Sequence, residues 1–125
     1  MFSLADLIME LTFHLVEQPY FESLDANRDY VPEAFAREGF IHCTDGAVEM
    51  ARIANLFYRA NSASHLYLYI DKTRVRAPIK YEDPQRLYPH VYGPLNRDAI
   101  IAIRLAQRAA NWDFLPPEMT EGSKQ

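Results

Sequence analysis

The sequence predicts a small α+β protein in which one main, mostly antiparallel or split β-sheet packs on one or two helices. First, short β-rich apolar runs recur along the chain, at residues 11–16, 39–44, 66–71, 79–82 and 100–105. Second, one segment, 45–58, instead repeats apolar residues at helical spacing. Third, 125 residues of which 49% are hydrophobic suit one domain with a packed core.

The first expected strand carries a histidine among core-type residues. Alternate side chains of a strand share a face, so Leu11, Phe13 and Leu15 are predicted to pack inward. His14 then lies on the opposite face with Thr12 and Val16, where it looks onto a second surface.

Two short helical segments are expected before the next strand. Pro19 is typical of the first turn of a helix, and residues 25–29 are rich in turn formers. A further helical turn over 33–38, with Phe35 inward, is expected to end at Gly39 as its C-cap.

The second histidine follows in the strand 39–44. Phe40, His42 and Thr44 share one face by alternation, whereas Ile41 and Cys43 share the other. The strand runs into a helix that Asp45 is predicted to cap. His42 and Thr44 therefore lie beside a helix N-terminus, where backbone N–H groups favour an anion.

The helix over 45–58 has an apolar stripe made by Met50, Ile53, Ala54 and Phe57, which is predicted to be core. Residues 61–64 read as a loop. Leu66, Leu68 and Ile70 form the aliphatic face of the next strand. His90 and Tyr92 are expected in a rigid loop braced by proline and glycine, and the chain is expected to fray from Asn111.

Charge is unevenly spread over a formal net charge of −4. The second half is mildly basic through Lys72, Arg74, Arg76, Lys80 and Arg86, which either steer a phosphate-bearing ligand or protect strand edges. The pI near 5.5 and the lack of a long basic run argue against a dedicated nucleic-acid binder.

The sequence has neither a membrane-spanning run nor a signal peptide, and these features bear on the expected cellular compartment. No apolar run approaches the roughly 20 residues that span a bilayer, and residues 1–13 lack the features of a signal peptide. The single Cys43 allows no internal disulfide. A cytoplasmic protein without a membrane partner is the expectation.

Six motifs occur in an order that resembles the bacterial domain-of-unknown-function 952 family. They are Phe13-His14, the Gly39-Phe40-Ile41-His42-Cys43-Thr44 strand, Ala54-Asn55-Leu56-Phe57-Tyr58, Leu66 to Asp71, Tyr81-Glu82, and Pro89-His90-Val91-Tyr92-Gly93-Pro94-Leu95. This resemblance divides the chain into an N-terminal extension (1–10), a single domain (11–115) and a flexible tail (116–125).

The resemblance implies a fold and a ligand. The family is grouped by fold with the ADP-ribosyltransferase superfamily, and its first half resembles the RNA 2′-phosphotransferases. It implies a small ADP-ribosyltransferase-like split β-sheet that binds NAD, as a substrate, or an ADP-ribose or phosphate compound. If the protein is an enzyme, the resemblance implies transfer of ADP-ribose or removal of a 2′-phosphate. RNA is a less supported partner.

The same resemblance implies roles for particular residues. His14 would bind the adenosine-side ribose, and His42 with Thr44 the nicotinamide side. Catalytic candidates are His42, Glu82 and His90, whereas the binding candidates are His14, His42, Thr44, Tyr58 and Tyr92. Glu82 would polarise a ribose hydroxyl, or it is an exposed surface acid. The alternative function is a non-catalytic nucleotide-sensing or protein-interaction module.

Metal and thiol chemistry are not expected. A zinc site from His14, His42, His90 and Cys43 lacks a short ligand pair. Cys43 should point away from its neighbour His42, which also disfavours a Cys–His nucleophile. Phosphate-cradling glycine loops and a GxSxG elbow are absent from the sequence.

Overall fold

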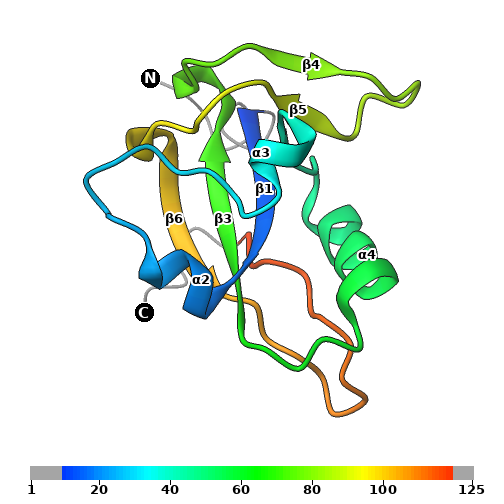
Figure 1. The fold of residues 1–125 in the computed structure, drawn as a ribbon. Coiled ribbons are helices and arrows are strands. Elements are labelled where there is room, and N and C mark those ends of the chain that lie inside the picture. Colours follow the sequence, from blue (N-terminus) through cyan, green and yellow to red (C-terminus); the bar gives the residue numbers. More distant parts are fainter. Residues whose placement is uncertain (1–9, 120–125) are drawn as a thin grey trace.

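Two small antiparallel sheets and three helices make up the part of the chain that the computed structural model describes, residues 10–119 (Figure 1). The first sheet has the strand order β1 (Leu11–Glu17), β3 (His65–Asp71), β6 (Ile100–Leu105). The second has the order β2 (Ile41–His42), β5 (Pro89–Val91), β4 (Ile79–Tyr81). The helices are α2 (Gln18–Ser23), α3 (Phe35–Glu38) and α4 (Ala47–Tyr58), with 3₁₀ turns at Lys72–Arg74 and Arg97–Ala99.

The first sheet is covered on both faces, which corrects the expected position of His14. His14 pairs with Leu68, and that face packs on a cluster that includes Tyr30, Ile41 and Val91. The opposite face, which carries Phe13, packs on residues of α4 and on the C-terminal segment. His14 is 6% exposed. The alternation of side chains between the two faces of β1 was predicted correctly. Because both faces are buried, this alternation does not separate buried from exposed residues.

Backbone pairs join the two sheets. Phe13 and Thr44 exchange N–H···O bonds of 2.9 and 2.8 Å. Tyr30 and Leu95 exchange two more, each of 2.8 Å. The segment after β2 is therefore fastened to the free edge of β1, and the chain before α3 is fastened to the segment that precedes β6.

Asp45 does not cap α4, so that prediction is wrong. The N-cap is Gly46, at φ 90°, a conformation that favours glycine. The Oδ2 atom of Asp45 instead accepts hydrogen bonds from Lys72 Nζ at 3.1 Å and Tyr81 Oη at 2.5 Å. Lys72 and Tyr81 are distant from Asp45 in sequence, so local pattern could not reveal this half-buried cluster, which ties the start of α4 to β4.

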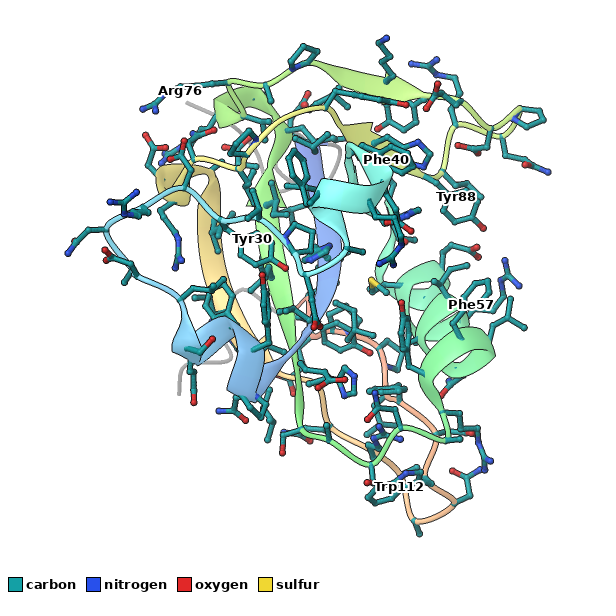
Figure 2. All side chains as sticks on the ribbon, in the orientation of Figure 1. Tyr30, Phe40, Phe57, Arg76, Tyr88 and Trp112 are labelled. Atoms are coloured by element: carbon teal, nitrogen blue, oxygen red, sulfur yellow. The ribbon has the colours of Figure 1, made fainter. Side chains whose placement is uncertain are left out.

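The predicted helix stripe is only partly core. Met50 and Ala54 are buried, but the Phe57 side chain, labelled in Figure 2, is 67% exposed. The C-terminal turn of α4 lines a cleft rather than packing tightly on β1, and the spacing rule could not foresee that gap. Phe57 as a core residue is a wrong prediction.

Other local predictions can be compared directly with the structure. The helix at Pro19, the turn closed by Gly39 at φ 82°, the 61–64 loop and the last strand are confirmed. His90 lies on β5 and not in a loop, because β2 and β4 pair on both sides of it. Phe114 is 2% exposed, so the chain does not fray from Asn111.

The ends of the chain are only partly described. Tyr69 Oη donates to the carbonyl of Glu118 at 2.8 Å, so the segment remains on the sheet up to that residue. Residues 1–9, most of the expected extension, and 120–125, most of the expected tail, lie outside the described residues. Within residues 10–119, no helix has the length and apolar character that crossing a membrane requires.

Substitution of the buried Leu68 should destabilise the fold far more than substitution of the exposed Phe57. Leu68→Ala empties a fully buried position and is expected to lower the free energy of unfolding by about 2 to 5 kcal/mol. Phe57→Ala should lower it by about 0.5 kcal/mol or less. Urea denaturation measures both values. Equal losses for the two variants would mean that Phe57 is a core residue after all.

Candidate functional site

A cleft of about 440 Å³ opens beside the edge of β1, within the size range of small-molecule sites. Its walls come from β1, α2, α3 with the segment before it, the end of β2, and the outer turns of α4. The lining is largely aromatic and apolar, through residues such as Phe13, Tyr20, Tyr30, Met50, Ile53, Phe57 and Tyr58.

His14 lies in the wall of this cleft with both ring nitrogens engaged. Its Nδ1 is 2.7 Å from the carbonyl oxygen of His42, which can only accept, so Nδ1 carries the proton. Its Nε2 then accepts the Tyr30 hydroxyl hydrogen at 2.7 Å. Burial lowers the pKa of His14 to about 4, so the ring is neutral at neutral pH. In this conformation His14 fastens β1 to β2 and to the segment around Tyr30.

His42 begins a row of polar side chains on the outer face of the second sheet. It is paired with His90 on β5, and His90 is paired with Lys80 on β4. The alternate residues of these strands, Ile41, Val91 and Ile79, pack in or against the core. The His42 side chain is 60% exposed, and its Nε2 lies 3.1 Å from Glu38 Oε1.

A carboxylate holds the middle histidine of this row. His90 Nδ1 donates to Glu82 Oε1 at 2.8 Å, and the Tyr92 hydroxyl donates to the same oxygen at 2.6 Å. These bonds, from Tyr92 first and His90 second, lower the pKa of Glu82. Glu82 is therefore exposed, as the surface alternative expected, yet it is an ionised carboxylate that orients an imidazole.

Phe40 packs this group together. Its ring stacks on His90 with centroids 4.1 Å apart and an interplanar angle of 17°, and it meets the His42 ring edge-on at 4.8 Å. The rings of His42 and His90 lie 5.3 Å apart. Because His90 Nδ1 keeps its hydrogen and donates it in a hydrogen bond to Glu82, a neutral His90 presents a lone pair on Nε2, as a general base requires.

The structure thus distributes the predicted site residues over two adjoining regions. His14, His42, Thr44 and Tyr58 line the cleft. His42, Glu82, His90 and Tyr92 form the cluster on the second sheet, which we call the histidine cluster together with Phe40 and Lys80. His42 belongs to both regions.

Sequence reasoning missed several contributors. Phe40 was placed on the face of His42 but given no role, Glu38 was not considered, and Lys80 was considered only for steering a phosphate-bearing ligand. Lys80 Nζ lies 4.9 Å from the centroid of the Tyr92 ring. The signal was present in part, because Lys80 and Glu82 are two residues apart in the predicted strand 79–82 and so share a face of it.

Three of the five basic residues that the sequence analysis named in the second half are already paired with acids. Lys72 bonds Asp45, Arg74 lies near Asp71, and Arg76 near Asp98. Among the cleft residues, Arg37 is the one lysine or arginine, against Glu17, Glu33 and Glu38. The cleft rim therefore favours a neutral or positively charged ring over a bare phosphate.

Cys43 lies apart from this chemistry. It is 2% exposed in the core beside Ile41, and burial raises the pKa of its thiol. A cysteine in this environment is an inert core residue.

The low pKa of His14 predicts a pH dependence of stability. Between pH 6.5 and about 4 the unfolded chain binds a proton at His14 that the folded chain excludes, so stability falls as the pH falls. His14→Gln removes the group that binds this proton. We expect the difference in unfolding free energy between the two proteins to shrink by about 1.4 kcal/mol per pH unit below pH 6.5. Denaturation from pH 7.5 to 4.5 measures it, and a constant difference contradicts the buried neutral imidazole.

Solved structures of a bacterial protein are similar in fold to this chain. The crystal structure of CC0527 from Caulobacter crescentus has a TM-score of 0.69 and 17% identity, over 86% of this chain and 93% of that protein. Its solution NMR structure has a TM-score of 0.65 and 17% identity, over 85% and 91%. At this identity the likeness shows the fold alone. No functionally curated protein matches the chain.

The model of a protein family matches residues 15–103, which is more than half of the chain. The matched range includes His42, Glu82 and His90 together with most of both sheets. The chain belongs to the family described as protein of unknown function (DUF952).

Proposed function

We propose that this protein binds NAD, or a related ADP-ribose or phosphate compound, in the cleft and transfers a group from it at the histidine cluster. The observation that carries the proposal is the position of His42, which lines the cleft and also contacts the ring of His90. A ligand lying in the cleft would thereby present one end to a carboxylate-held imidazole.

The chemistry of the cleft supports a ligand with planar rings. Aromatic side chains line it, and carboxylates outnumber arginine at its rim. Nicotinamide joined to ribose is a planar cation, and such a ring suits aromatic walls and acidic neighbours. The superfamily resemblance of the sequence motifs supports the same ligand class, as a fold-level analogy.

The reaction we propose breaks the bond between the nicotinamide nitrogen and ribose C1′, and the bonding electrons leave with nicotinamide. The oxygen of an acceptor hydroxyl forms the new bond to C1′. His90 Nε2 takes the proton of that hydroxyl as general base. Glu82 accepts both of its internal hydrogen bonds at Oε1, so Oε2 is the oxygen that would face the positive charge developing on the ribose.

A second candidate function is a non-catalytic nucleotide-sensing or protein-interaction module. Two observations favour it. Both nitrogens of His14 are used within the fold, so His14 offers no donor to a ribose in this conformation. In addition, Arg37 is the one lysine or arginine in the cleft lining available to a pyrophosphate.

Turnover separates these functions. Wild-type protein incubated with NAD is expected to release nicotinamide, and His90→Asn or Glu82→Gln should lower the rate by about 100-fold or more, the scale of a lost general base. Calorimetry with ADP-ribose should give little change in Kd for either variant. Glu22→Gln is the matched control, an exposed acid on α2 at the far end of the molecule from β4 (Figure 1).

The outcomes differ for each function. Saturable binding of NAD without nicotinamide release would support the binding module and contradict catalysis. Absence of binding by both NAD and ADP-ribose would contradict the proposed ligand class. A rate equal in wild type and Glu82→Gln would remove the histidine cluster from the mechanism.

A further inference from the structure

His65 is a second buried histidine in the cleft wall, and it lies away from the histidine cluster. It is the first residue of β3 and is 2% exposed. Its Nδ1 is 2.8 Å from the carbonyl oxygen of Ala63, so Nδ1 carries the proton. Burial is the main cause that lowers the pKa of His65. The neutral ring therefore has a lone pair on Nε2.

That lone pair has no partner. Nε2 of His65 is a buried atom without a hydrogen bond among residues 10–119. Buried polar atoms in folded proteins are nearly always paired, so an unpaired acceptor in the wall of a cleft indicates a missing donor. The residue opposite His65 on β1 is Glu17, whose carboxylate accepts from Asn61 and is a further acceptor at this end.

The position of His65 along the cleft follows from the strand register. Glu17 pairs with His65, whereas His14, three residues earlier on β1, is bonded to the His42 carbonyl. Three residues of strand span about 10 Å. His65 thus lies at the end of the cleft opposite to His42, where the unreactive part of a ligand would be.

From this geometry we infer that His65 Nε2 accepts a hydrogen bond from the exocyclic amino group of an adenine ring, and that it selects adenine at this end of the cleft. This inference rests on the proposed function, which places the reacting end of the ligand beside His42. Two acceptors at the His65 end, a ring nitrogen and a carboxylate, suit a ligand that donates through an NH₂ group.

Aromatic rings make room for such a ligand. His65 lies between Phe114, edge-on at 5.3 Å, and Tyr58, tilted at 6.1 Å. Phe114 is buried and fixed, whereas Tyr58 is 45% exposed at the end of α4. The Tyr58 ring is the one that can turn aside, and it would then lie against the adenine ring and open the path to Nε2.

A pair of dinucleotides tests the inference. Nicotinamide hypoxanthine dinucleotide differs from NAD in having a carbonyl acceptor at C6 where adenine has the amino donor, and in carrying a hydrogen on N1. Calorimetry on the full chain should give about tenfold or more weaker binding of this analogue. Nicotinic acid adenine dinucleotide, altered at the other ring only, is the control, since it keeps the adenine amino group and its affinity should fall together with that of NAD when His65 is changed.

Two variants assign the preference to Nε2. In His65→Asn the amide nitrogen replaces Nδ1 and keeps the bond to Ala63, but nothing replaces Nε2, so NAD and the hypoxanthine analogue should bind alike. His65→Gln carries an amide oxygen near the position of Nε2 and should restore part of the preference. If neither variant folds, the imidazole ¹⁵N spectrum of wild type decides, because the His65 Nε2 resonance should move upfield on addition of NAD.

The inference and the proposed function fail in different ways. Equal affinity of wild type for NAD and for the hypoxanthine analogue would overturn the role of His65 and leave the cleft as an NAD site. An unchanged preference for NAD in His65→Asn, or an unmoved Nε2 resonance, would do the same. Failure of both dinucleotides to bind would overturn the inference and the proposed function together.

Discussion

The two hydrogen bonds of the His14 ring are the constraint on which the rest of the structure depends. One joins β1 to the carbonyl of His42, and the other joins it to the hydroxyl of Tyr30. Because the ring is buried and neutral, both bonds require one tautomer, with the proton on Nδ1. Tyr30 is itself fully buried and bonded to Leu95 through its backbone. Three segments distant in sequence are thus held around one imidazole.

This arrangement determines where His42 can act. Its carbonyl is held by His14, so its backbone is fixed at the cleft, while its side chain is 60% exposed. One face of the second sheet therefore packs on the core, and the other face carries the candidate site residues. Ile41 and Val91 close the core beneath Tyr30 and Leu95, and the outer face carries the histidines. A group built on paired strands is held more rigidly than one built on a loop.

Local sequence pattern predicted the elements better than their environment. Period-two alternation found the strands other than β5, and Gly39 marked the end of α3, because such signals depend on neighbouring residues only. Alternation could not tell that β1 and β3 are buried on both faces, since the layer over His14 comes from Tyr30 and Val91. Asp45 was misread for a related reason, because Lys72 and Tyr81 reach it from distant segments.

The candidate site was predictable to a similar extent. Its histidines and Glu82 were identified, and the pairing of β2, β5 and β4 brings three of them into one cluster. Which of these residues line the cleft and which form the histidine cluster could not be predicted without the strand register. His65 carried no sequence signal as a site residue, because its meaning depends on an unpaired atom that only the folded chain reveals.

The most direct test of the central claim, that one cleft feeds the histidine cluster, is a crystal structure of the protein with ADP-ribose. The account predicts ligand density along β1 between His65 and His42, with the terminal ribose within hydrogen-bonding distance of the His90 or Glu82 side chain. Density confined to another surface, or a ribose directed away from His42 into solvent, would contradict it.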